Sequence, residues 1–238
     1  MISKPAESAL AEIKPCNERI LVAHFNGNGF PALSIVEHYS PVEGNPEAEA
    51  HYGNLLSATQ DIPKHNVLLV VGDCNAHLGS DLTRYTYHKS TNKNGVLVSD
   101  MVNEAGLAIT NTMFRKKLWL WTFISDMNGS KTQVGYIMVN KKWKNSVKNC
   151  EAYSSFSSMG SDHRIMTARL KLEPVKLHQK CYLIGITSVT QLFRIHSPLL
   201  FGTGTVDYAR TMNLQQITTS ISFIASKRQQ RNIYRKIK

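Results

Sequence analysis

Residues 67–76 read Val67-Leu68-Leu69-Val70-Val71-Gly72-Asp73-Cys74-Asn75-Ala76. Five apolar residues in a row are typical of a strand that is buried on both faces of a sheet. Gly72 ends the apolar run, and Asp73 and Asn75 follow it. Phosphodiester hydrolysis needs a base that activates water and polar groups that steady the phosphate. The end of this predicted strand therefore indicates a candidate site for such chemistry.

A second polar island reads Met159-Gly160-Ser161-Asp162-His163-Arg164-Ile165. In the first island, Asp73 is a candidate base, and Asn75 could orient it or donate to a phosphate oxygen. In the second, Asp162 could bind a hard cation such as Mg²⁺. His163 could donate to a phosphate oxygen or act as an acid or base. Tyr39, at the end of another predicted strand, could donate to phosphate as well.

Each island also has an ordinary structural explanation. Gly-Asp-x-Asn is common in turns, where Asp and Asn bond their own backbone, and Ser-Asp-His can form a helix cap or a loop. The two islands in this order, each flanked by predicted strands, are more specific than either one alone.

The net charge of +11 favours a polyanionic partner in general. Ten basic and two acidic side chains follow Leu172, so this last segment carries eight of the eleven net charges. The basic character of the chain is therefore largely a property of its tail and says little about the candidate site.

The four cysteines lie far apart and show no zinc-binding spacing, which favours reduced thiols in an intracellular protein. The first residues lack the apolar core of a signal peptide. No apolar run approaches the roughly 20 residues that span a bilayer. We therefore expect a nuclear or cytoplasmic protein that is not secreted and has no membrane partner.

The chain divides into three parts by pattern. Residues 1–18 are polar and predict a loose lead-in. Residues 19–172 begin with a predicted hairpin, in which the turn signal at residues 26–29 joins strands 20–25 and 33–39. Further predicted strands alternate with two amphipathic helices, one capped by Asn45 and one from about Val96 to Ala105, and residues 92–95 predict a turn before the second helix. This order predicts a layered α/β domain with a mixed sheet. Residues 173–238 are basic and show no clear period. This tail is either a poorly ordered extension or a segment for nucleic-acid binding or nuclear targeting.

Several stretches within residues 19–172 resemble the endonuclease/exonuclease/phosphatase superfamily. Their sequences are most similar to the endonuclease domain of non-LTR retrotransposons and to the craniofacial development protein 2-like proteins. Residues 173–238 match no family that we recognise. The stretches that carry the resemblance are residues 39–41, 62–66, 72–76, 118–123, 133–142 and 161–163.

The resemblance implies a four-layer α/β sandwich that cleaves DNA with Mg²⁺, or with Mn²⁺, and without a small-molecule cofactor. By matching motif positions, it implies that Asp73 activates the water and Asn75 supports it. It also implies that Tyr39 contacts phosphate, that Asp162 helps to hold the metal and that His163 binds the scissile phosphate. No oligomeric state follows from the resemblance.

Two departures from the family pattern predict impaired catalysis. The family places an Asn and a metal-binding Glu on strands that precede the hairpin at Ile20, so the domain is expected to be N-terminally truncated and its metal binding weakened. Glu7, Glu12 and Glu18 are poor substitutes, because their surroundings are polar and do not predict a strand. In addition, Gly135 stands where the family motif has the Asp that orients the catalytic His, and glycine has no side chain to do so.

Three hypotheses for the function follow. The first is a degenerate retrotransposon endonuclease domain with little or no cleavage. The second is a working nuclease or phosphatase that takes its metal-binding Glu from elsewhere. The third is a non-catalytic nucleic-acid-binding protein, which would show salt-sensitive binding without cleavage. The sequence favours the first.

Overall fold

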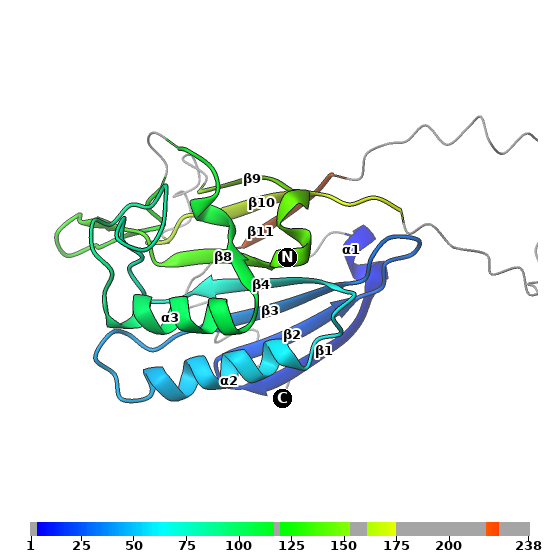
Figure 1. Ribbon diagram of the computed structural model, residues 1–238, viewed down its shortest axis with the longest axis horizontal. Coiled ribbons are helices and arrows are strands. Elements are labelled where there is room, and N and C mark those ends of the chain that lie inside the picture. Colours follow the sequence, from blue (N-terminus) through cyan, green and yellow to red (C-terminus); the bar gives the residue numbers. More distant parts are fainter. Residues whose placement is uncertain (1–3, 117–119, 153–160, 175–217, 224–238) are drawn as a thin grey trace, which may run out of the picture. The chain divides into compact units, whose positions relative to one another are not determined.

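The apolar run at the centre of the sequence forms β4 (Val67–Asp73), in which every residue is buried. The computed structural model describes residues 4–116, 120–152, 161–174 and 218–223, which all lie in one unit of the chain. β4 lies inside a six-stranded sheet of order β1-β2-β3-β4-β8-β5 (Figure 1). The other strands of this sheet are β1 (Leu10–Asn17), β2 (Ile20–Phe25), β3 (Leu33–Tyr39), β5 (Leu107–Ile109) and β8 (Gly135–Asn140).

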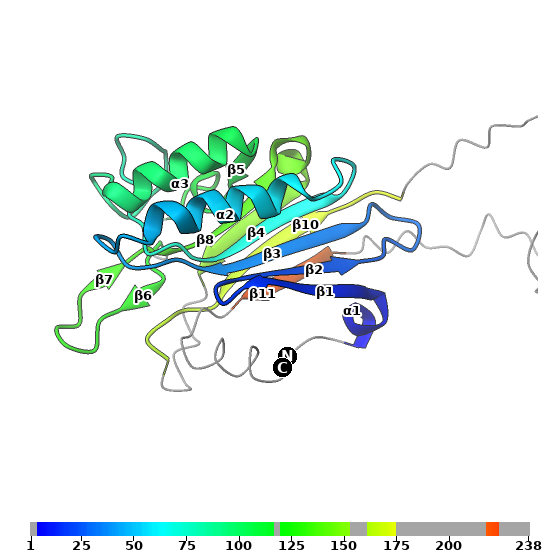
Figure 2. The same ribbon diagram turned by 90° about the horizontal axis from the view of Figure 1, so that it is seen from below.

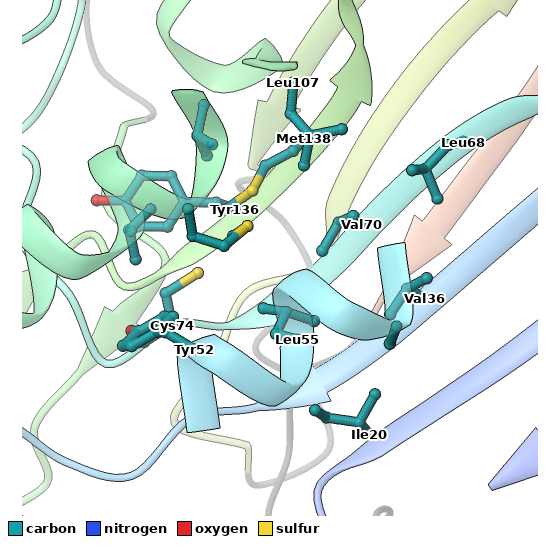
Figure 3. Packing of buried hydrophobic residues seen from close by; sticks show 14 of the residues in the cluster. Ile20, Val36, Tyr52, Leu55, Leu68, Val70, Cys74, Leu107, Tyr136 and Met138 are labelled. Atoms are coloured by element: carbon teal, nitrogen blue, oxygen red, sulfur yellow. The ribbon is translucent and has the colours of Figure 1, made fainter. Parts of the chain in front are cut away.

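One face of this sheet is covered by two helices, α2 (Ala48–Gln60) and α3 (Lys93–Glu104) (Figure 2). Side chains alternate along a strand, so Leu68 and Val70 of β4 point toward the helices. There they pack with Leu55 of α2 in one hydrophobic cluster (Figure 3). β3 and β4 are parallel, and α2 makes the crossover between them, as parallel strands require.

The opposite face of the sheet packs against a second sheet of order β11-β10-β9. Its strands are β9 (Val147–Ala152), β10 (Met166–Lys171) and β11 (Thr218–Phe223). Val67, Leu69 and Val71 of β4 form a second hydrophobic cluster with residues of β8, β9 and β10. The described residues thus build a helix layer on two sheets, and the predicted α/β fold class is confirmed.

Five shorter elements complete the described chain. A hairpin of two short strands projects beyond the end of the six-stranded sheet (Figure 2). The elements are α1 (Lys4–Ala9), the 3-10 helices η1 (Thr110–Thr112) and η2 (Lys141–Ser146), and the hairpin strands β6 (Phe123–Ile124) and β7 (Lys131–Thr132). No helix of the described residues is long and apolar enough to cross a membrane. Cys16, Cys74 and Cys150 are free thiols.

The predicted hairpin of residues 20–25 and 33–39 is confirmed by the antiparallel pairing of β2 and β3. The loose lead-in is wrong, because residues 4–9 form α1 and residues 10–17 form β1. Glu12 accordingly lies on a strand. β1 pairs with β2 through its backbone, but nearly all its side chains are exposed, so it has no apolar alternation that a sequence pattern could detect.

The two helices also differ from prediction at their starts. α2 begins at Ala48, with Glu47 as its N-cap, and Asn45 accepts the Glu47 N–H in a preceding turn instead of capping the helix. α3 begins at Lys93, because Asn92 is its N-cap and accepts the Gly95 N–H. The stretch 92–95, which predicts a turn, is therefore the first turn of a helix. In the tail, only residues 173–174 and β11 lie within the described residues, and β11 pairs with β10 along all six residues.

Gly72 is required by the close approach of β3 to β4. A Cβ built on Gly72 would lie 2.0 Å from the His38 carbonyl oxygen, which is backbone and cannot turn away. We expect Gly72→Ala to lower the free energy of unfolding by about 3 kcal/mol, measured by urea denaturation.

Gly53 is the matched control, because it is exposed on α2 and a Cβ there meets nothing within 4 Å. Gly53→Ala should raise the free energy of unfolding by about 0.5–1 kcal/mol, since alanine is the better helix former. A Gly72→Ala protein as stable as wild type would contradict the close approach of the two strands.

Candidate active site

Three neighbouring strands bring Tyr39, Asp73 and Gly135 side by side at one end of the six-stranded sheet. Tyr39 is the register partner of Asp73 on β3, and Gly135 is its register partner on β8. Register partners point to the same face of a sheet, and this face is the one that packs against the second sheet. The Asp73 carboxylate at the end of β4 therefore has Tyr39 on one neighbouring strand and Gly135, which has no side chain, on the other.

Asp73 is almost fully buried, at 3% exposure, and is oriented by the backbone that follows it. Its Oδ1 accepts the Asn75 N–H at 2.9 Å. An extended segment would place Asn75 on the same side as Asp73, but Asn75 has a left-handed φ of 45°, so the chain turns here instead. The Asn75 side chain instead donates to the Ser40 carbonyl at 2.7 Å. Asn75 thus supports Asp73 through its backbone and ties β4 to the loop after β3.

Two buried tyrosine hydroxyls fix the turn that carries Asp73. The Tyr52 hydroxyl of α2 donates to the Cys74 carbonyl at 2.6 Å, and the Tyr136 hydroxyl of β8 lies 3.2 Å from the Ala76 carbonyl. The Cys74 thiol points into the helix-side core, and burial raises its pKa well above the usual value. Cys74 is therefore a structural thiol.

His163 meets Asp73 across the two sheets. Its Nε2 lies 3.9 Å from Asp73 Oδ2 and also 3.9 Å from Asp162 Oδ1. The imidazole and the Asp73 carboxylate are buried, whereas the Asp162 side chain is 41% exposed. The structure thus brings together the two islands of polar sequence, which lie about 90 positions apart in the chain.

The segment that carries His163 is hydrogen-bonded to β6 and to the residue before it. The Ile124 N–H donates to the Asp162 carbonyl, and the Arg164 N–H donates to the Thr122 carbonyl. The Phe123 ring packs on the His163 ring at a centroid distance of 4.9 Å. The Ser161 hydroxyl also accepts the His163 N–H at 3.2 Å. Ser161-Asp162-His163 is therefore both a local turn and the carrier of a site residue.

No protein-family model matches the chain. In sequence, the chain is 27% identical to craniofacial development protein 2 of Bos taurus over 182 residues, which is 73% of this chain but 30% of that protein. Among solved structures, it resembles the endonuclease domain of TRAS1, a telomere-specific non-LTR retrotransposon. The TM-score is 0.51, with 17% identity over 65% of this chain and 64% of that one.

It also resembles the 3′ phosphatase NExo from Neisseria, in a structure bound to a product DNA hairpin, with a TM-score of 0.53 and 13% identity. This match covers 68% of the chain and 71% of the NExo chain. The chain has the endonuclease/exonuclease/phosphatase fold. The resemblance that the sequence motifs predict is confirmed, and the chain spans about 30% of the length of its curated relative.

In this endonuclease/exonuclease/phosphatase fold, Gly135 leaves room beside Asp73. A Cβ on Gly135 would meet Thr122 Oγ1 at 3.5 Å and Met166 Cγ at 3.8 Å, which are ordinary contacts. The glycine is therefore not needed for packing, unlike Gly72. With no side chain at position 135, the His163 imidazole faces Asp73 directly.

The described residues do not form a self-contained Mg²⁺ site. Asp73 and Asp162 each place one carboxylate oxygen 3.9 Å from His163 Nε2. Within residues 4–116, 120–152 and 161–174, no three His, Cys, Asp or Glu side chains come close enough together to hold a metal ion. A hard cation prefers several oxygen ligands around one point, and this donor set alone does not fit one.

Two buried polar residues that the sequence analysis missed shape the backbone around Gly135. Asn111 donates to the Gly135 carbonyl at 3.1 Å and accepts the Ile137 N–H at 2.9 Å. Thr122 Oγ1 accepts the N–H groups of Val134 and Gly135 at 2.9 Å each. Asn111 belongs to no stretch that carries the family resemblance. Thr122 lies within one, residues 118–123, but the resemblance assigns it no role.

A cationic and aromatic cluster adjoins His163, and its Arg164 is itself buried at 9% exposure. The Arg164 guanidinium stacks over the Trp121 ring at 3.0 Å, and Lys131 Nζ lies 5.1 Å from the same ring. Burial lowers the pKa of Arg164. Stacked guanidinium and indole groups beside a carboxylate–imidazole pair are suited to an anionic ligand that has flat groups.

Proposed function

We propose that this chain is a DNA-binding endonuclease domain of retrotransposon descent whose phosphodiester cleavage is impaired. The observation that carries the proposal is the buried Asp73–His163 pair at the strand ends, next to a glycine at position 135. The fold shared with the TRAS1 endonuclease domain and with the DNA-bound phosphatase NExo supports DNA as the substrate.

The proposed roles follow from the atoms that the site presents. The Asp73 carboxylate, held by the Asn75 N–H, accepts a proton from the attacking water. His163 Nε2 donates to a phosphate oxygen, and the Tyr39 hydroxyl, on the adjacent strand, contacts another. Both carboxylates face the same Nε2. Their negative charges would compete with a phosphate oxygen for the proton on this nitrogen, which is one physical reason for slow cleavage.

We further propose that Mg²⁺ or Mn²⁺ binds weakly. Asp162 is the exposed carboxylate of the site and the candidate ligand. Mg²⁺ is commonly held by one or two carboxylates together with substrate phosphate oxygens. Cation affinity should therefore be low in the free protein and higher with DNA present.

The deciding experiment is nicking of supercoiled plasmid by the full chain with Mg²⁺ or Mn²⁺, next to binding of a labelled duplex in EDTA by fluorescence anisotropy. We expect binding that weakens steeply with salt. We expect slow nicking, and Asp73→Asn should abolish it while leaving binding intact. Asp100→Asn removes the same charge from an exposed position of α3 and should change neither reading.

Each departure from this result has a definite meaning. Fast nicking that Asp73→Asn abolishes would show that catalysis is not impaired. Nicking that survives Asp73→Asn would show that Asp73 is not the base. Binding without any nicking would favour the non-catalytic nucleic-acid-binding protein. No binding of DNA at all would sink the proposal.

A further inference from the structure

Residues 82–89, Leu82-Thr83-Arg84-Tyr85-Thr86-Tyr87-His88-Lys89, form an irregular segment between β4 and α3 that we call the tyrosine loop. It presents two tyrosine rings to solvent, Tyr85 at 40% and Tyr87 at 41% exposure. Exposed aromatic rings that gather in one loop can mark a surface that contacts a partner. Contacts within and below the loop keep the two rings exposed.

Hydrogen bonds to one buried residue fix the loop in place. Gln133 is 1% exposed, and its Oε1 accepts from the Tyr87 N–H at 3.1 Å and from the Thr86 hydroxyl at 3.3 Å. The Gln133 backbone N–H donates to His88 Nε2 at 3.1 Å. The loop is therefore preorganised, and a partner would not have to pay the entropy of ordering it.

The rings themselves are also oriented. Tyr87 packs edge-on against His88 at 5.3 Å, and His88 stacks on His77 at 3.8 Å with nearly parallel planes. Tyr85 has a φ of 47°, in the left-handed region that a bulky residue rarely adopts. Such backbone conformations persist where the surrounding contacts enforce them, and they concentrate at functional sites.

The charge around the rings selects the kind of partner. Arg84 and Lys89 flank the two tyrosines and are exposed, and Lys131 is exposed beyond Thr132. The Thr132 hydroxyl lies within 3.1 Å of both His77 Nε2 and His88 Nε2, so the hairpin strand β7 lies against the base of the loop. Two acids lie near this region and both accept hydrogen bonds. Asp81 accepts from the Thr91 hydroxyl at 2.8 Å, and Glu43 accepts the Lys93 N–H at 2.9 Å. Aromatic rings with interspersed cations are what bind unpaired nucleotides, through stacking and phosphate contacts.

The loop also lies beside the candidate active site. Gln133, which holds the loop, precedes by two residues the Gly135 that pairs with Asp73. Six residues, 76–81, join the Asp73–Asn75 turn to the loop. Within them, the His77 N–H donates to the Asn92 side chain at the start of α3. We propose that the tyrosine loop is a base-stacking platform that binds unpaired nucleotides of a DNA strand next to the Asp73–His163 site. This inference rests on the proposed function and names the form of DNA that the site prefers.

The test compares three fluorescent DNAs of one sequence, a single strand, a blunt duplex and a duplex with a single-stranded overhang. They are titrated with the full chain in EDTA and followed by anisotropy. Tyr85→Ala and Tyr87→Ala should each weaken binding of the single strand and the overhang by about tenfold, and blunt duplex binding by less than about twofold. Tyr85→Phe and Tyr87→Phe keep the rings and should bind as wild type. Val96→Ala, at an exposed apolar position of α3, should have no effect.

Failure of this inference can be told apart from failure of the proposed function. If the Ala variants bind all three DNAs as wild type does, or if the Phe variants lose as much as the Ala variants, the rings do not stack on bases and the platform is wrong. Either result leaves duplex binding and nicking untouched as support for the proposed function. If single strands bind through the tyrosines but duplex is neither bound nor nicked, the platform stands and the endonuclease proposal is wrong.

Discussion

Gly135→Asp should raise the rate of plasmid nicking by about 10²–10⁴-fold. Position 135 is the register partner of Asp73, and a Cβ there has only ordinary contacts, so the position accepts the first atom of a side chain without a clash. A carboxylate that orients a catalytic histidine contributes on the order of 10⁴ in rate in a comparable His–Asp pair. A carboxylate at position 135, in addition to those of Asp73 and Asp162, would orient the imidazole and let His163 turn its donor nitrogen toward the phosphate.

Gly135→Asn is the matched control for this gain, because it adds the same volume without the charge. It should nick no faster than wild type, and Gly135→Ala should match it. Adding Asp73→Asn to Gly135→Asp should abolish the gained activity, since the base is then absent. Equal rates for the Asp and Asn variants would contradict an orienting role for a carboxylate at this position.

The same substitution should also lower stability. The introduced carboxylate would stand directly opposite Asp73 on a neighbouring strand, and like charges at paired positions destabilise a sheet. Gly135 is buried, so water screens the repulsion poorly. A lower urea midpoint for Gly135→Asp than for Gly135→Asn, together with faster nicking, would show that activity and stability oppose each other at this position.

The parts of the fold that follow from the sequence are those where burial imposes a period. β4 could be predicted because both its faces are covered, and the β2–β3 hairpin because a strong turn signal joins two alternating strands. β1 could not, because its side chains are exposed and only its backbone pairing makes it a strand. The cap at Asn92 was missed because an Asn-Gly stretch has the same composition in a turn and at a helix start.

In the candidate site, too, some features follow from a local sequence pattern and others do not. Asp73 and His163 could be predicted to meet because each lies at the end of an apolar segment, where strand ends gather. The contribution of Asn75 through its backbone depends on a left-handed φ that no residue pattern specifies. The roles of Gln133, Asn111 and Thr122 depend on which backbone groups the folded chain brings to them. Such contacts belong to the tertiary structure and have no local signal.

The free energy of unfolding should fall steeply as the pH drops from about 6.5 toward 5, because two histidines are buried in their neutral form behind the site. His38 on β3 is 1% exposed and His51 on α2 is 5% exposed, with 3.5 Å between His38 Nδ1 and His51 Nε2. Burial, and then the nearby His51, lower the pKa of His38 to about 3. Burial, and then the charge of Arg19, lower the pKa of His51 to about 4.

The direction of this change in the free energy of unfolding follows from which state binds the protons. Below pH 6.5 the unfolded chain binds a proton at each histidine, whereas the folded protein does not until the pH nears 4, so acid favours the unfolded state. Each histidine should contribute a slope of about 1.4 kcal/mol per pH unit within this window. The half-buried pair His77 and His88 acts in the same direction, because burial lowers both pKa values. The contribution of these neutral histidines to stability is complete above pH 6.5 and is lost as the pH falls.

Urea denaturation of the full chain between pH 5 and 6.2, followed by tryptophan fluorescence, measures this slope above the range where carboxylates titrate. His51→Gln should reduce the slope by about one histidine's share, whatever it does to the absolute stability. His65→Gln, at an exposed position before β4, should leave the slope unchanged. A wild-type slope near zero, or one that His51→Gln does not alter, would mean that the protein accepts these protons while folded. The helix-side core would then have to open to water directly behind Asp73, and the rigid turn that holds this carboxylate would lose its support.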